Sequence, residues 1–148
     1  VLKQCIRVAQ IAQLLEIPII GTEQSPSSLG SNLDPIQSYC SKTIKKEHFN
    51  ACADGLTAAI PDNRQQCILM GCETHVCLMQ TALKLIDESY DVSVVVDGVG
   101  SRRALDKKIA LDRLQTAGAR LVTGEMLGFE WLMSAKNPVF KEVLALLK

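Results

Sequence analysis

The stretch that decides the fold is Cys67-Ile68-Leu69-Met70-Gly71-Cys72-Glu73-Thr74-His75-Val76-Cys77. Its short apolar run, stopped by a glycine, predicts a buried strand, and the periodic segment that follows predicts an amphipathic helix. Cys77 should therefore lie near a helix N-terminus, where free backbone N–H groups and the positive end of the helix dipole favour a thiolate. The stretch predicts a cysteine that can act as a nucleophile.

Strands and helices alternate on both sides of this stretch. We expect strands at 17–20, 66–70, 92–96 and 119–122, a weaker strand at 41–44, a loop at 21–33, helices at 1–16, 74–88, 101–116, 123–135 and 138–147, and a broken helix at 47–59. Such alternation predicts right-handed βαβ units and a parallel sheet with helices on both faces. The sequence has no internal repeat and no linker. We therefore expect a single three-layer α/β/α domain over residues 1–148.

Composition narrows the class of partner. The chain has 148 residues, 47% of them hydrophobic, with 16 positive and 16 negative side chains. A nucleic-acid binder would normally show a basic excess, and no segment approaches the roughly 20 apolar residues of a membrane span. We expect a small-molecule substrate and other copies of the chain as partners, with no nucleic acid and no membrane.

The six cysteines do not suggest a disulfide framework. Most of them lie in apolar, periodic segments, which suits a reducing compartment and predicts a cytoplasmic protein. We interpret Cys5, Cys67 and Cys72 as small buried hydrophobes. The spacing lacks the close cysteine pair that structural zinc sites and thiol redox proteins share. A zinc site and a redox function are therefore both weakly supported.

A cysteine nucleophile needs a base or a cation beside it and donors for the oxyanion. The chain has two histidines, His48 and His75. His75 is only two residues from Cys77 and should point elsewhere on the turn, so a Cys–His pair there is doubtful. Asp97 follows the strand at 92–96, and we favour a capping or turn role for it over a role in the site.

Four stretches resemble one known family. They are Gly71–Cys77 with Thr81-Ala82 a turn later, Ile17–Gln24 followed by Leu29-Gly30, the pair Lys42-Thr43, and Val94–Asp97 followed by Ser101-Arg102. In this order and spacing they are similar to the isochorismatase-like cysteine hydrolases, in the branch of isochorismatase domain-containing proteins. The resemblance runs over nearly the whole chain and implies a Rossmann-like, isochorismatase-type hydrolase fold.

The resemblance also implies an Asp–Lys–Cys triad. Cys77 matches the nucleophile, and Lys42 matches the lysine whose charge would favour the thiolate. The backbone N–H groups of Glu73 and Cys77 would form the oxyanion hole, with a cis peptide at Cys72–Glu73. Possible substrate contacts are Gln24, Thr74 and His75.

The third member of that triad is an aspartate on a first strand, which is expected at the centre of the sheet. This sequence opens in the helix that would follow that strand, so we expect the chain to be N-terminally incomplete. The metal-dependent amidases of the superfamily add an Asp/His cluster upstream of the lysine. Between Gly21 and Lys42 the chain has only Glu23 and Asp34 and no histidine, so we expect no metal and no other cofactor.

Two functions remain open at this point. One is a cysteine hydrolase that acts on a small amide-like molecule through a thioester. The sequence does not predict which molecule is the substrate. The other is an inactive member of the family that serves as an oligomeric binding or scaffold subunit. The aromatic and apolar residues near the C-terminus would pack against a second copy or form part of the core: Phe129, Trp131, Leu132 and Met133. A homo-oligomer is expected in either case.

Overall fold

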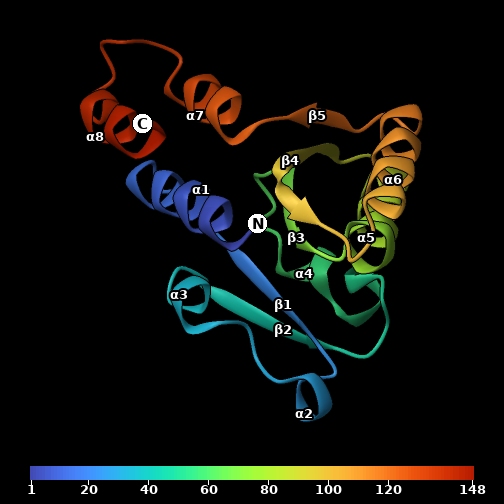
Figure 1. The fold of residues 1–148 in the computed structure, drawn as a ribbon. Helices are drawn as coiled ribbons and strands as arrows, with labels where there is room; N and C mark the ends of the chain where they lie inside the picture. The colour runs from blue at the N-terminus through green and yellow to red at the C-terminus, as the bar shows by residue number, and fades with distance from the viewer.

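A computed structural model describes all residues 1–148, which form two parallel β-sheets with helices on both sides (Figure 1). The smaller sheet pairs β1 (Ile20–Gln24) with β2 (Lys42–Lys46). The larger sheet has the order β3 (Gln66–Cys72), β4 (Asp91–Gly100), β5 (Arg120–Val122). The fold is α/β with parallel strands, as the alternation predicted. The sheet is nevertheless divided, because no strand pairing joins β1 to β3.

The helical elements follow the chain in this order: α1 (Leu2–Leu14), α2 (Pro26–Leu29), α3 (Asp34–Gln37), the 3₁₀ turn η1 (Ala51–Asp54), α4 (Leu56–Ala59), the π-helical turn η2 (Thr74–Leu78), α5 (Met79–Asp87), α6 (Ala104–Thr116), α7 (Gly124–Leu132) and α8 (Phe140–Leu147). None of them combines the length and the apolar character that crossing a bilayer would require.

The core lies on both faces of β4. Val92 and Val94 pack with α5 and α6 on one face, through residues such as Leu85 and Leu114. Val95 packs on the opposite face with α1 and α7. Because side chains alternate along a strand, a strand covered on both faces is apolar at nearly every position. The run of valines in β4 has this cause, and it confirms the expected layering of helices around the larger sheet.

The strand β1 starts three residues later than its apolar run predicted. We expected a strand at 17–20 and a loop from residue 21, whereas β1 extends from Ile20 to Gln24. Its partner is β2, with Ile20 opposite Lys42 and Gln24 opposite Lys46. Polar residues are poor strand formers on average, but pairing with a neighbouring strand overrides that tendency. The prediction of a loop at 21–24 is therefore wrong.

Two of the expected helices also differ from the structure. The segment 47–59 holds only the short elements η1 and α4. Helix α6 starts at Ala104 instead of Ser101, and the hydroxyl of Ser101 contacts His75. Asp97 accepts a hydrogen bond from the backbone N–H of Gly124 at the start of α7, at 2.9 Å, which agrees with the capping role that we favoured.

Candidate functional site

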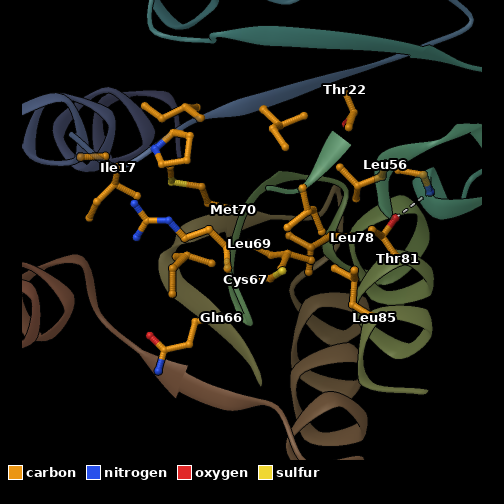
Figure 2. A pocket seen from close by; sticks show the side chains of 18 of the residues that line it. Ile17, Thr22, Leu56, Gln66, Cys67, Leu69, Met70, Leu78, Thr81 and Leu85 are labelled. Carbon is orange, nitrogen blue, oxygen red and sulfur yellow. Dashed lines mark hydrogen bonds between the residues drawn. The ribbon is translucent and has the colours of Figure 1, made fainter. Parts of the chain in front are cut away.

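A pocket of about 660 Å³ lies between the two sheets. On one side it is lined by Ile17–Ile20 and Thr22, and on the other by residues 65–70 of the β3 segment. Figure 2 shows Ile17 and Thr22 facing Cys67, Leu69 and Met70 across this space. Lys46 and Cys77 both line this pocket, so it holds a cation and a thiol.

The turn that carries Cys77 has the strand–turn–helix form that the sequence predicted. Strand β3 ends at Cys72, a cis peptide joins Cys72 to Glu73, and η2 carries Cys77 into α5. The carbonyl oxygen of Glu73 accepts hydrogen bonds from the N–H groups of Val76 and Leu78, at 3.2 and 3.3 Å. The N–H of Glu73 itself donates to no other group of the chain. It is a free donor on the turn.

Lys46, which the sequence argument missed, is the lysine of the pocket. It lies at the end of β2 with only 3% of its surface exposed. Its Nζ donates to the carbonyl oxygens of His48 and Phe49, at 3.1 and 3.2 Å, and to Oε1 of Gln24. All three acceptors are neutral, so this buried ammonium has no carboxylate partner within the chain. Such a charge is costly to bury without dense hydrogen bonding.

Lys42, the lysine suggested by the family resemblance, lies elsewhere. It is exposed at the opposite end of β2, opposite Ile20, and it does not line the pocket. Four residue steps along the strand separate it from Lys46, about 13 Å at the usual rise per residue. The structure therefore does not bring Lys42 and Cys77 together. The sequence did carry a signal, because Ile44 and Lys46 share one face of β2 and the site lies at the carboxyl end of the strands.

Gln24 lies between the lysine and the cysteine. Its Oε1 accepts from Nζ of Lys46, and the Cys77 thiol donates to the same oxygen over 3.8 Å. Its Nε2 donates to the carbonyl oxygen of Glu47, at 2.8 Å, and to the hydroxyl of Ser25, at 3.1 Å. Gln24 thus belongs to the site, but its polar atoms already have partners within the protein.

The other two expected substrate contacts do not line the pocket. Thr74 is fully buried, and its Oγ1 has no hydrogen-bond partner. His75 places Nδ1 2.9 Å from the hydroxyl of Ser101 and Nε2 3.9 Å from a carboxylate oxygen of Asp106. The doubt about a Cys–His pair is consistent with this arrangement, because His75 is held against the loop that precedes α6.

An ion pair ties the start of the Cys77 turn to that loop. The guanidinium of Arg102 donates to both carboxylate oxygens of Glu73, at 2.8 to 3.2 Å, and its backbone N–H donates to the same group at 2.9 Å. The side chain of Arg102 and then its N–H lower the pKa of Glu73 to about 2. Glu73 is therefore fully ionised at neutral pH, and its ion pair holds residues 72–74 against the loop that precedes α6.

The remaining cysteines are free thiols: Cys5 is buried as expected and Cys67 is half-buried, whereas Cys72 is exposed, so the prediction of a buried Cys72 is wrong. Burial raises the pKa of Cys5, Cys40 and Cys52, and it raises that of Cys67 to about 11, with a smaller contribution from Cys52. These four thiols stay protonated at neutral pH. No three side chains of His, Cys, Asp or Glu gather in a way that could hold a metal ion.

Comparisons with known proteins agree with this fold. The chain is 40% identical over 140 residues to isochorismatase domain-containing protein 2 of Xenopus laevis, covering 93% of this chain and 68% of the relative. It is 34% identical over 145 residues to isochorismatase domain-containing protein 1 of Danio rerio, covering 96% of this chain. The chain spans only 51% of that longer relative.

Solved structures give the same result. A Caenorhabditis elegans protein described as MAR1 ribonuclease superposes with a TM-score of 0.93 at 32% identity, covering 99% of this chain and 77% of that one. The YcaC gene product of Escherichia coli, described as an octameric hydrolase of unknown specificity, superposes with a TM-score of 0.87 at 26% identity, covering 98% and 73%. The family model for the isochorismatase domain matches residues 1–126. From its fold, its sequence and these relatives, the chain belongs to the isochorismatase family.

Proposed function

We propose that this chain carries the core of a cysteine hydrolase, in which Cys77 attacks the carbonyl carbon of a small amide-like substrate. The thiolate sulfur would bond to that carbon, and the C–N bond would then break as the nitrogen takes up the proton given up by the thiol, which releases an amine and leaves a thioester on Cys77. Water would hydrolyse the thioester and return the free thiol. The free N–H of Glu73 and that of Cys77 would stabilise the oxyanion.

The observation that carries this proposal is the buried ammonium of Lys46 beside the sulfur of Cys77, linked by Gln24. A positive charge near a thiol favours its ionised, nucleophilic form. We therefore assign to Lys46 the part that the family resemblance suggested for Lys42. The family resemblance implies that an aspartate carries out the proton transfers. Within residues 1–148, no carboxylate bonds to Lys46 or Cys77.

The alternative, an inactive scaffold subunit, is less well supported. A buried ammonium held only by neutral oxygens costs free energy, and a protein with a purely structural role would have no use for it. Membership of the isochorismatase family and the hydrolase among its structural neighbours point in the same direction. We keep the expectation of a homo-oligomer as a proposal, supported by the octameric neighbour and by the exposed side chains of Phe129 and Met133 at the end of α7.

Thiol reactivity tests the proposal without knowledge of the substrate. The chain is treated with iodoacetamide at pH 7, and modification of each cysteine is followed by peptide mass spectrometry. Cys77 should react faster than Cys72, which is exposed but has no lysine partner. The variant Lys46→Met should slow the alkylation of Cys77 by about tenfold, because it removes the positive charge that favours the nucleophilic form of the thiol. Lys42→Met, the matched control, should leave the rate unchanged.

Two outcomes would overturn the proposal: a Cys77 that reacts no faster than an ordinary thiol, or a larger effect from Lys42→Met than from Lys46→Met. Urea unfolding of each variant checks that the fold is retained. A second experiment incubates the protein with a panel of small amides and with RNA, and looks for an acyl adduct by intact mass. We expect an adduct with an amide, absent in Cys77→Ser, and no turnover of RNA.

A further inference from the structure

We propose that Arg102 is a positioning residue that orients the backbone N–H of Glu73 toward the substrate oxygen by binding the side chain of the same glutamate. This inference rests on the proposed function, since it concerns the oxyanion that forms when Cys77 attacks a carbonyl carbon. Arg102 is exposed and does not line the pocket, so it acts through Glu73 and not on the substrate itself.

The other polar groups of Glu73 are all occupied. Its carbonyl oxygen accepts from the N–H groups of Val76 and Leu78, and its carboxylate accepts four hydrogen bonds from Arg102, at 2.8 to 3.2 Å. One of these four comes from the backbone N–H of Arg102, so the carboxylate is tied to the main chain as well as to the guanidinium. The N–H of Glu73 is the polar group of this residue that is left to bind a developing oxyanion.

The ion pair lies just beyond the ladder that joins β3 to β4. The pairing of these strands ends at Cys72 and Gly100. Past these residues the two segments separate, one into η2 and the other into the loop that precedes α6, and no backbone hydrogen bond joins them. The carboxylate of Glu73 and the guanidinium of Arg102 bridge this separation. A side-chain contact therefore replaces the ladder at the residue that carries the oxyanion donor.

The geometry of this contact suits it to orientation. Nε of Arg102 lies 3.2 Å from both carboxylate oxygens of Glu73, and Nη2 lies 2.8 Å from one of them. The planar fork of an arginine fixes the angle of a carboxylate as well as its distance, whereas a lysine acts as a point charge. A second contact between the same segments joins His75 to the hydroxyl of Ser101 at 2.9 Å. Loss of Arg102 alone therefore leaves the turn attached but frees the Glu73 peptide to reorient.

Two reactions of Cys77 distinguish an effect on the oxyanion from an effect on the thiol. With 4-nitrophenyl acetate, the thiolate sulfur bonds to the carbonyl carbon, an oxyanion forms, and 4-nitrophenolate leaves with the electron pair of the broken C–O bond. With iodoacetamide, the sulfur displaces iodide from a saturated carbon and no oxyanion forms. Both probes are uncharged, so replacing Arg102 removes no charge that either of them needs for binding.

The test measures both rates at pH 7, with the nitrophenolate release of Cys77→Ser subtracted as background. Arg102→Met should slow acylation by about 10- to 100-fold, because a misplaced donor loses much of its effect on the transition state. It should change alkylation by less than about twofold, since the charge beside the thiol is unaltered. Arg113→Met, at an exposed arginine further along α6, is the matched control and should change neither rate.

Two further variants test whether Arg102 acts through Glu73. Glu73→Met removes the other partner of the same ion pair and should give the same selective loss of acylation. The double variant should be no slower than the slower single variant, because both substitutions remove one interaction. Arg102→Lys keeps the charge without the fork, so it should recover only part of the acylation rate.

The outcomes separate this inference from the proposed function. A wild-type Cys77 that reacts with both probes no faster than an ordinary thiol would refute the hydrolase proposal itself. A reactive wild-type Cys77 with unchanged acylation in Arg102→Met would overturn only the role of Arg102. Equal losses in both reactions would also overturn it, because they would trace the effect to thiol ionisation or to the fold. If Arg102→Met does not fold, an unchanged ratio of the two rates in Arg102→Lys overturns the inference.

Discussion

The two sheets of this protein differ in what they bury. In the larger sheet, Val94 and Val95 are completely buried between helices on both faces. In the smaller sheet, the buried side chains of the strands are Ile44 and two charged groups, Glu23 and Lys46. Burial of apolar surface stabilises a fold, whereas burial of charge costs free energy. The larger sheet is therefore the source of stability, and the smaller one carries the costly residues of the site.

The segment after β2 joins the two regions by apolar packing of Cys52, Leu56 and Ile60 against the core of the larger sheet and by a few polar contacts. The backbone N–H of Ala51 in η1 donates to the buried hydroxyl of Thr81 in α5, at 3.0 Å. Figure 2 shows Thr81 at the rim of the pocket with this bond drawn. The Cys77–Gln24 contact is a second link. Regions with few apolar contacts open at lower free energy than the global core, so we expect the smaller sheet to open separately.

The largest effect should come from the core of the larger sheet. Leu85→Ala removes a side chain that is 1% exposed and should lower the free energy of unfolding by about 3 kcal/mol. Native-state hydrogen exchange should show this loss in the amides of β4, whereas the amides of β1 and β2 should keep their own, lower protection. Leu105→Ala, at a position 67% exposed, is the control and should change stability by less than about 0.5 kcal/mol. An equal loss in both sheets would mean that they open as one unit.

The link between the sheets is tested by Thr81→Val. The substitution keeps the shape of the side chain but leaves the buried N–H of Ala51 without an acceptor, which costs about 1–3 kcal/mol. We expect faster hydrogen exchange in β2 and slower alkylation of Cys77, because Lys46 is then held less often beside it. Unchanged exchange in β2, with stability lost only in β4, would contradict the polar link.

A third prediction concerns acid. The pKa of Glu73 lies below its ordinary value, so its ion pair with Arg102 contributes stability above about pH 4.5 and loses that contribution as the pH falls toward 2. In urea unfolding, the midpoint of Arg102→Met should lie below that of the wild type at pH 7, and the difference should shrink between pH 4.5 and pH 3. Arg103→Met, an exposed neighbour without such a bond, should show no pH-dependent difference. A constant deficit for Arg102→Met would assign its effect to packing.

The smallest effect is expected at Thr74. Its hydroxyl is buried without a partner, so Thr74→Val removes an unsatisfied polar atom and keeps the shape. Stability should stay the same or rise by at most about 1 kcal/mol, in contrast to Thr81→Val. Thermal unfolding of the two variants side by side measures this contrast. A clear destabilisation by Thr74→Val would show that the hydroxyl has a partner after all.

The difference between the two sheets also explains which elements could be predicted from the sequence. The strand β4 and the helix α5 were both predicted from their apolar residues, although β4 runs on to Gly100 and the first turn of the expected helix is the π-helical η2. The turn with Cys77 followed from the change of period at Gly71. Lys46 was missed because β1 and β2 consist mainly of polar residues, and only pairing between them sets their bounds. A one-dimensional pattern does not show that a lysine at the end of such a strand is buried.

Hydrogen-bond partners were equally hidden from the sequence. Ser101 was expected at the start of a helix, but its hydroxyl contacts His75, 26 residues away. Gln24 was expected as a possible substrate contact, and the structure shows that its side chain also bonds to four groups of the protein itself. Residue type limits which bonds a side chain can make, whereas the tertiary fold selects among the possible partners.

The ion pair between Glu73 and Arg102 makes the loop before α6 part of the support that fixes the turn of Cys77. None of residues 101–103 lines the pocket. A change of sequence in this loop would therefore alter the position of Cys77 without touching any molecule bound in the pocket.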